Sequence, residues 1–317
     1  MVRISESSLR KNYYYIKPFI PRWLQIQLRR WVILSKRSRY WDVWPIDEKA
    51  AKPPDEWTGW PEGKQFALVL THDVENVKGR EKCIQLAALE EALGFRSSFN
   101  FVAEGYHVSA ALRSYLTDRG FEVGIHGIKH SGNPFTSKEI FQGQGIKINQ
   151  YLKDWKSVGF RCPCMYHNLE WIGELDIHYD ASTFDTDPFE PQPDGMGTIF
   201  PFWVQNGSSA KGFIELPYTL PQDFTLFILM KEKNIDIWKK KLNWIVEKGG
   251  MALLITHPDY MNCEKVRCGI EEYPMDFYRQ LLGYIENKFE GQYWNPLPKE
   301  IARFWKENMV LRQLADL

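Results

Sequence analysis

From Phe66 onward, short apolar runs alternate with longer amphipathic segments. The apolar runs predict buried strands, which we place at 66–71, 97–102, 121–125, 157–161, 178–183, 212–217 and 251–256. The periodicity of the intervening segments predicts helices at 78–93, 108–119, 136–155, 233–248 and 274–289. Such regular alternation implies a parallel sheet, and about seven strand-helix units can close a barrel or nearly so. We therefore predict an α/β fold with a (β/α)7-type barrel.

A different pattern precedes the barrel, in residues 12–44. Apolar residues recur there at helical spacing, while polar ones share another face: Trp23, Leu24, Leu28, Trp31 and Val32 against Arg22, Gln25 and Arg29. Tryptophans and arginines on one helix are typical of peripheral contact with an anionic membrane, and an arm that packs on its own body or on a partner subunit fits equally well. No nucleic-acid-binding module accompanies the arm, so we predict no nucleic-acid partner.

A Pro/Gly-rich linker over 45–63 separates the arm, residues 1–44, from a catalytic domain predicted over 64–317. Although the formal net charge is zero, residues 1–41 hold ten Lys and Arg and one acid, a net charge of +9. The rest of the chain has 30 basic and 39 acidic residues, a net charge of −9. A basic arm on an acidic body suggests an anionic surface as partner, or docking of the arm on the body.

Composition indicates the compartment. The five cysteines are an odd number, scattered along the chain, and fit reduced thiols better than a disulfide framework. No stretch approaches the ~18–20 uninterrupted apolar residues of a spanning helix. The N-terminus also lacks the apolar segment and cleavage site of a signal peptide. We expect a cytoplasmic protein, with at most a peripheral membrane contact.

The carboxyl ends of the predicted strands carry side chains that can do chemistry. The first strand leads into Asp73 and Glu75, and "HGIKH" after the third strand supplies His126 and His130. Because parallel strands end at the same edge of a sheet, these side chains could lie together. Two imidazoles and a carboxylate can hold a catalytic divalent metal with open positions, although an ordinary strand exit and an exposed histidine pair would explain each segment alone.

Later strands end in further candidates. Arg161 could orient a carboxylate or brace the rim of the barrel. Asp180, Asp185 and Asp187 lie in a Pro-rich segment, where solvated loop acids are the alternative. His257 follows the apolar run "MALLIT", where a structural strand cap is the alternative. Each of these candidates is weak alone, but a shared functional site is a stronger hypothesis because all of them follow predicted strands.

In this order, the segments "THDVE", "HGIKH", "GFRCPCMYHN", "YDASTFD" and "LLITH" resemble the five motifs of the NodB-type polysaccharide deacetylases, the fourth family of carbohydrate esterases. The resemblance covers roughly residues 64–290, and the histidine pair and the terminal Leu-x-x-His strand are its most specific parts. It implies a distorted (β/α) barrel that removes N-acetyl groups from amino sugars with one divalent metal, often zinc.

The resemblance also implies roles for individual residues. The histidine pair would bind the metal, and His257 would be the general acid that protonates the leaving amine. Arg161 would tether the catalytic carboxylate. Asp180, or Asp185 in the same segment, would hold His257 in the right tautomer.

The first motif departs from the family's common Thr-Phe-Asp-Asp-Gly and resembles a variant with Asp-x-Asp. We therefore assign Asp73 as general base and Glu75 as metal ligand, and the length of the Glu side chain leaves Asp73 as the alternative ligand. With His126 and His130 these residues complete the expected metal site.

The function expected from the sequence is a metal-dependent N-deacetylase, acting on an amino sugar of a surface-glycan precursor that is nucleotide-, lipid- or oligosaccharide-linked. A deformylase or another amide hydrolase on the same barrel is one alternative. A non-catalytic glycan-binding protein with a decayed site is another. Glu75 favours decay of the site, whereas retention of the histidine pair, Arg161 and His257 argues against it.

Overall fold

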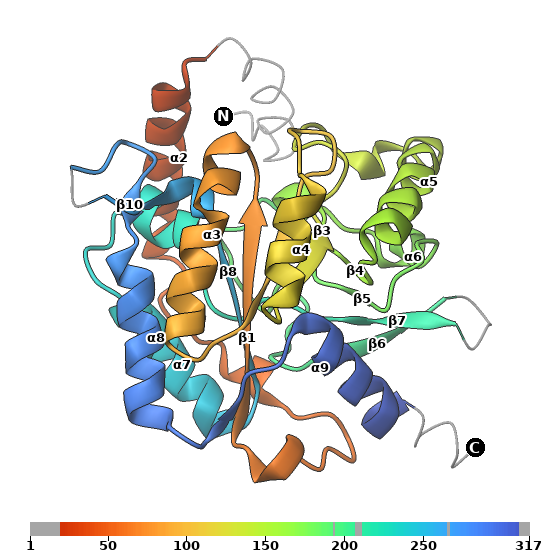
Figure 1. Ribbon diagram of the computed structural model, residues 1–317. Coiled ribbons are helices and arrows are strands. Elements are labelled where there is room, and N and C mark those ends of the chain that lie inside the picture. The colour runs from red at the N-terminus through yellow and green to blue at the C-terminus, as the bar shows by residue number, and fades with distance from the viewer. Residues whose placement is uncertain (1–19, 193, 207–210, 265–266, 311–317) are drawn as a thin grey trace, which may run out of the picture.

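The computed structural model describes residues 20–192, 194–206, 211–264 and 267–310 (Figure 1). Its main sheet has nine strands in the order β11-β1-β2-β3-β4-β5-β7-β6, with β8 also paired to β1. The strands are β1 Phe66–Val74, β2 Ser97–Phe101, β3 Glu122–Ile125, β4 Gly159–Phe160, β5 Tyr179–Asp180, β6 Phe202–Gln205, β7 Gly212–Glu215, β8 Met251–Thr256 and β11 Tyr293–Trp294. All pairs in this sheet are parallel except that between β6 and β7.

The chain beyond β7 closes the barrel. Tyr218 bridges to Phe184 beyond β5, and Leu220 bridges to Leu254 in β8. The backbone N–H groups of Thr219 and Leu220 both donate to the carbonyl of Leu253, each at 3.0 Å. The predicted barrel is therefore confirmed, with its last gap spanned by an irregular segment instead of a full strand.

Helices surround the sheet on its outer side (Figure 1). They are α2 Arg22–Arg37, α3 Val77–Ala92, α4 Ala110–Asp118, α5 Lys138–Trp155, α6 Leu169–Ile172, α7 Asp236–Lys248, α8 Asp276–Phe289 and α9 Pro298–Trp305. Short helical turns connect them: η2 Glu48–Ala51, η3 Pro61–Gly63, η4 Pro134–Thr136, η5 Pro163–Met165, η7 Pro258–Tyr260 and the π-helices η6 Phe224–Leu229 and η8 Lys306–Val310. A small second sheet pairs β9 Met261–Asn262 with β10 Tyr273–Pro274.

All seven predicted strands and five predicted helices are present, although β4 and β5 shrink to two residues each. The patterns missed β6, which forms a hairpin with β7, and also η6 and α9. A four-residue hairpin strand and a six-residue π-helix are too short for periodicity to separate them from loops.

Strand β1 is the centre of the barrel. All nine of its residues are buried, because β2 and β8 flank it and helices cover its outer face. The register pairs Thr71 with Ile255 and His72 with Thr256. The next residues along the two strands, Asp73 and His257, therefore emerge side by side at the carboxyl end of the sheet.

The segments before the barrel pack against it. Trp44 and Trp60 are buried, and the indole N–H of Trp60 donates to the carbonyl of Gly249 at 2.8 Å. In the predicted arm, α2 buries Ile26 and Ile33, while residues 12–19 lie outside the described residues. None of the helices described combines the length and the apolar composition needed to span a bilayer.

Candidate metal and catalytic site

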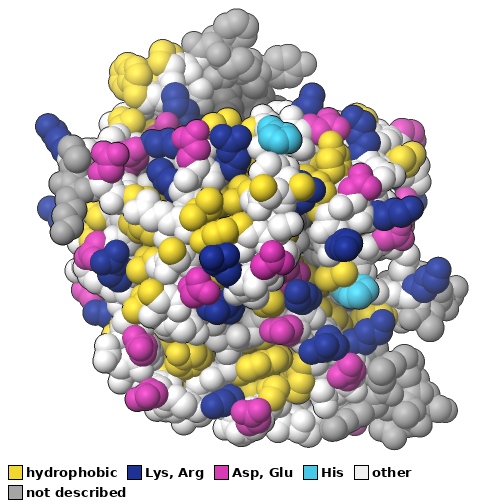
Figure 2. Space-filling model, in the orientation of Figure 1, with side chains coloured by type: hydrophobic (Ala, Val, Ile, Leu, Met, Phe, Trp, Pro, Cys, Tyr) yellow, Lys and Arg dark blue, Asp and Glu magenta, His cyan; other side chains and the backbone are white. Residues whose placement is uncertain are grey.

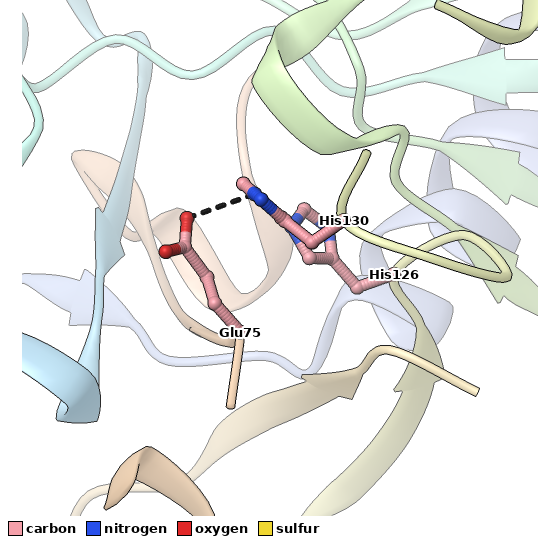
Figure 3. A group of neighbouring side chains, drawn as sticks. All are labelled: Glu75, His126 and His130. Carbon is pink, nitrogen blue, oxygen red and sulfur yellow. Dashed lines mark ion pairs between the residues drawn. The ribbon is translucent and has the colours of Figure 1, made fainter. Parts of the chain in front are cut away.

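Three potential metal ligands meet at the carboxyl end of the barrel (Figure 3). Glu75 follows β1, and His126 and His130 follow β3. Their ligand atoms lie within 4.8 Å of one another, and Nε2 of His130 is 2.9 Å from Oε1 of Glu75. The structure thus brings together three of the four predicted ligands, and Glu75 instead of Asp73 is the carboxylate of this group.

The protonation of His126 fits a divalent metal. Nδ1 of His126 lies 3.2 Å from the carbonyl oxygen of Arg161, and since a carbonyl only accepts, Nδ1 carries the proton and Nε2 keeps its lone pair. Burial lowers the pKa of His126 to about 4, so this imidazole is neutral at physiological pH. Burial also lowers the pKa of His130, but the Glu75 carboxylate outweighs it and raises that pKa. Two imidazole nitrogens and one carboxylate form a donor set suited to zinc and similar metals.

The segment after β8 holds Glu75 in place. The hydroxyl of Tyr260 donates to Oε2 of Glu75 at 2.7 Å. The Asp259 carboxylate accepts from the backbone N–H groups of Glu75 at 3.0 Å and Asn76 at 2.9 Å. A Cβ at Gly79 would lie 2.2 Å from Oδ2 of Asp259, so this packing requires glycine. Burial raises the pKa of Glu75, but the neighbouring His130 has the larger effect and lowers it below its usual value. The side chain is therefore ionised.

Asp73 lies beside this group. Its Oδ1 accepts from Nη1 of Arg161 at 2.9 Å and from Nδ2 of Asn100 at 3.0 Å. Its Oδ2 is 3.9 Å from Nδ1 of His126. Burial alone would raise the pKa of Asp73, but Arg161 and His126 outweigh it and hold the pKa well below its usual range. Asp73 is therefore a buried, ionised carboxylate.

Arg161 makes the predicted contact with Asp73 through one nitrogen. The same Nη1 donates to the hydroxyl of Thr71 at 2.8 Å, and Nε donates to the carbonyl of Ala181 at 2.8 Å. Arg161 is only 1% exposed. Arg161 does both things that the sequence suggested for it. It orients a carboxylate, and it also ties β1 to the segment after β5.

His257 faces the group from the other side. Its Nε2 is 3.8 Å from Oε1 of Glu75. Its Nδ1 donates to Oδ1 of Asp223 at 2.7 Å, and its backbone N–H donates to Oδ2 of Asp223 at 2.8 Å. The hydroxyl of Tyr273 also donates to Asp223, at 2.9 Å. Burial lowers the pKa of His257, but Asp223 and the nearby carboxylates raise it to about 10.

The prediction that Asp180 or Asp185 orients His257 is wrong. Asp180 accepts from the hydroxyl of Ser182 at 2.7 Å and lies in register with Glu215, and Asp185 forms a buried ion pair with Lys241. The reason is strand order, because β5 is separated from β8 by the segment that continues β7.

The three acidic residues of the Pro-rich segment are buried, so they are not the solvated loop acids that the sequence offered as an alternative. Asp180, Asp185 and Asp187 are at most 3% exposed, and Asp187 accepts from the backbone N–H of Phe189 at 2.9 Å. They are structural groups in the buried part of the protein. The partner of His257 that sequence reasoning missed, Asp223, is the only acid between Glu215 and Glu232. Asp223 lies beyond the carboxyl end of β7, which is the end of the sheet that carries the other site residues. That position is the feature of the sequence that could have identified it.

No protein-family model matches this chain, and no curated protein matches it by sequence. Solved structures do match. A protein from Mycobacterium smegmatis assigned as a polysaccharide deacetylase is 17% identical, with a TM-score of 0.60 over 80% of this chain and 95% of that chain. A protein from Pseudomonas aeruginosa PAO1 assigned to the same activity is 15% identical, with a TM-score of 0.60 over 84% and 99% of the two chains.

PuuE allantoinase is similar to the same degree, at 14% identity and a TM-score of 0.62 over 84% of this chain and 98% of that one. At such identities the likeness concerns the backbone. The chain has the distorted (β/α)-barrel fold of these polysaccharide-deacetylase-like proteins.

Proposed function

We propose that this protein is a metal-dependent N-deacetylase that acts on an amino sugar of a surface-glycan precursor. The observation that carries the proposal is the order of side chains at the barrel's carboxyl end. The group of Glu75, His126 and His130 lies between an ionised carboxylate, Asp73, and a histidine, His257, whose Nε2 faces it. When bound there, a divalent metal such as zinc would polarise the amide carbonyl and acidify water.

Asp73 is suited to act as the general base. It is ionised and held by two donors, so its free Oδ2 can accept a proton from the attacking water. Arg161 and Asn100 keep this carboxylate in place while its charge changes. The Arg161 side chain is buried and bound to two further acceptors, so it has little freedom to follow any other group.

His257 is suited to act as the general acid. Amide cleavage needs a proton on the leaving nitrogen, since an amide anion is too basic to depart. Asp223 accepts from Nδ1 and thereby leaves Nε2 as the nitrogen that delivers the proton. The raised pKa of His257 agrees with a side chain that holds its proton until the amine forms.

A second candidate is hydrolysis of a different amide on the same barrel. The similarity to PuuE allantoinase favours it, because the name of that protein indicates a substrate other than a sugar polymer. Release of formate, as by a deformylase, belongs to this candidate too. A non-catalytic glycan-binding protein is the remaining alternative, and the intact set of side chains argues against it.

The proposal includes the cell-biological expectations from the sequence. The substrate is a nucleotide-, lipid- or oligosaccharide-linked precursor, the protein acts in the cytoplasm, and residues 12–44 make peripheral contact with the membrane. None of the five cysteines, all of which lie in the described residues, forms a disulfide, which agrees with a reducing compartment.

The first experiment measures metal content after chelator washing and zinc reloading. We expect about one equivalent in the wild type and none in a His126→Ala/His130→Ala variant. A His107→Ala/His178→Ala variant is the matched control, because both of those histidines are exposed and neither belongs to the group. Loss of zinc in the control as well, or absence of zinc from the wild type, would contradict the proposed site.

The second experiment measures acetate, formate and ammonia released from N-acylated amino-sugar conjugates and from small amides. Acetate from a sugar supports the proposed reaction, whereas formate or ammonia from another amide supports the second candidate. A metal-loaded protein that binds glycan and releases no product would support the non-catalytic alternative.

A further inference from the structure

Helix α2 turns Arg30 towards the body and its two tryptophans towards solvent. Arg30 is buried, and it donates to the carbonyls of Ile228 at 2.8 Å and Ile270 at 3.0 Å. By contrast, Trp23 is 57% exposed and Trp31 is 71% exposed. This is the reverse of the usual pattern, in which a surface helix exposes its charged residues.

The orientation of α2 is fixed by several contacts. Ile26 and Ile33 belong to the hydrophobic core. At the two ends of the helix, Arg22 pairs with Glu271 and Arg37 pairs with Glu232, each at 2.6 Å. Rotation of the helix about its axis would break both ion pairs and expose both isoleucines. The apolar outer face is therefore built into the fold.

This outer face forms a patch, which we name the tryptophan face. Of the eleven large hydrophobic side chains exposed in the described residues, five are on α2 and define this face: Trp23, Leu28, Trp31, Val32 and Leu34. Hydrophobic side chains stand out from the upper left edge of the molecule, where α2 lies in Figure 1 (Figure 2). Contiguous apolar patches of this kind mark interaction sites.

Charge and composition identify an anionic membrane surface as the partner. Tryptophan favours the boundary between lipid headgroups and acyl chains, where its ring is apolar and its N–H can reach water. Residues 20–41 contain six basic residues and no acid, and residues 1–19 add four basic residues and one acid. Two copies of this positive arm would repel each other face to face, whereas an anionic bilayer attracts it.

The tryptophan face lies at the catalytic end of the barrel. The guanidinium of Arg29 is 4.8 Å from the centre of the Phe224 ring, and that ring is 4.9 Å from the ring of Tyr260, which binds Glu75. Phe224 begins η6, against which α2 packs, and Asp223 immediately precedes it. In Figure 1, α2 rises at the end towards which the arrow of β1 points.

We propose that the tryptophan face inserts into the headgroup region of an anionic bilayer and thereby presents the catalytic end to the membrane surface. Resting on the proposed deacetylase function, this docking selects the lipid-linked form among the possible precursors, because such a sugar is held at the same surface.

The experiment is sedimentation of the full-length protein with vesicles, of phosphatidylcholine alone and of phosphatidylcholine mixed with phosphatidylglycerol. We expect binding to the mixed vesicles that weakens at high salt, and a loss of at least about tenfold in apparent affinity in Trp23→Ser/Trp31→Ser. The matched control is Ile140→Ser/Ile146→Ser on α5, since both of its isoleucines are also exposed, at 46% and 75%. It should bind as the wild type does.

Circular dichroism and metal content, measured on all three proteins, show whether each variant is folded. Absence of wild-type binding to either vesicle, or equal binding by the tryptophan variant, would overturn the proposal. So would a dimer that light scattering shows to depend on Trp23 and Trp31, because the face would then cover a second copy. Vesicle binding needs no turnover, so an inactive protein that still binds would overturn only the proposed reaction.

Lipid binding also predicts a kinetic difference. The tryptophan variant should hydrolyse a soluble amino-sugar conjugate at the wild-type rate. It should lose at least about tenfold in kcat/KM for the same sugar displayed on mixed vesicles, through KM. Equal kinetics of the two proteins on both substrates would contradict the choice of a lipid-linked precursor.

Discussion

Asp223 binds His257 twice, accepting from its Nδ1 at 2.7 Å and from its backbone N–H at 2.8 Å. These two hydrogen bonds fix the orientation of the imidazole and keep a proton on Nδ1, the nitrogen that donates to Asp223. The opposite nitrogen, Nε2, then faces the Glu75 carboxylate. Since Asp223 is also the N-cap residue of η6, the helical turn under α2 and the candidate general acid share one carboxylate.

Replacement Asp223→Asn should lower kcat by about 10²-fold or more, because an amide can present its N–H to Nδ1 and favour the wrong tautomer. Metal content should stay near that of the wild type, since Asp223 is not in the ligand group. Steady-state kinetics on the substrate from the release screen measures the effect. Asp180→Asn is the control and should retain more activity, because Asp180 bonds to Ser182. Equal losses in the two variants would contradict the role assigned to Asp223.

Replacement Tyr260→Phe should weaken metal binding by roughly 10- to 100-fold, because outer hydrogen bonds orient a ligating carboxylate. The hydroxyl of Tyr260 donates to Glu75, whereas the hydroxyl of Tyr284 donates to Asn243 at 2.9 Å on the outside of the barrel. Tyr284→Phe is therefore the matched control. Competition with a chromogenic chelator gives both affinities, and an unchanged affinity in Tyr260→Phe would show that Glu75 needs no such support.

Glu122 should make stability depend on pH. Burial raises its pKa from 4.5 to about 7 despite hydrogen bonds from Lys299 N–H and the Tyr179 hydroxyl. Between pH 4.5 and about pH 7, the folded state binds more protons at Glu122 than the unfolded state does. The free energy of unfolding therefore falls as pH rises from 4.5 to about 7. The loss should be on the order of 2 kcal/mol in the free energy of unfolding.

Urea unfolding of the wild type and of Glu122→Gln, at about pH 5 and about pH 8, isolates this contribution from the other titrating groups. The difference in stability between wild type and variant should shift in favour of Glu122→Gln at the higher pH. A difference that stays constant, or that moves the other way, would mean that Glu122 is ionised throughout.

The buried ion pair of Asp185 and Lys241 should be costly to break. Both side chains are at most 2% exposed, so Lys241→Ala leaves an uncompensated carboxylate in the protein interior. We expect a loss of about 3–5 kcal/mol in the free energy of unfolding, measured in urea. The double variant Asp185→Asn/Lys241→Met removes both charges and should lose much less. Additive losses would show that the two charges do not interact.

The sequence by itself determined the barrel and the three potential metal ligands of the site. Apolar runs such as the one that forms β1 are buried on both faces, so their hydrophobicity marks them whatever their neighbours are. Glu75 and His126 directly follow strands of one parallel sheet and His130 lies in the loop after the second of them, so that topology places all three at the same edge.

Only the tertiary structure decided the partners of those residues. Asp223 lies 34 residues before His257 and Tyr260 lies 185 residues after Glu75, so their pairing depends on the order of strands around the barrel. The sequence pattern of α2 likewise fitted both a docked arm and a membrane contact. Local patterns indicate how much of a side chain is buried, whereas the surface that covers it depends on contacts between distant segments. In the structure, Arg30 is covered and Trp23 and Trp31 are open to solvent.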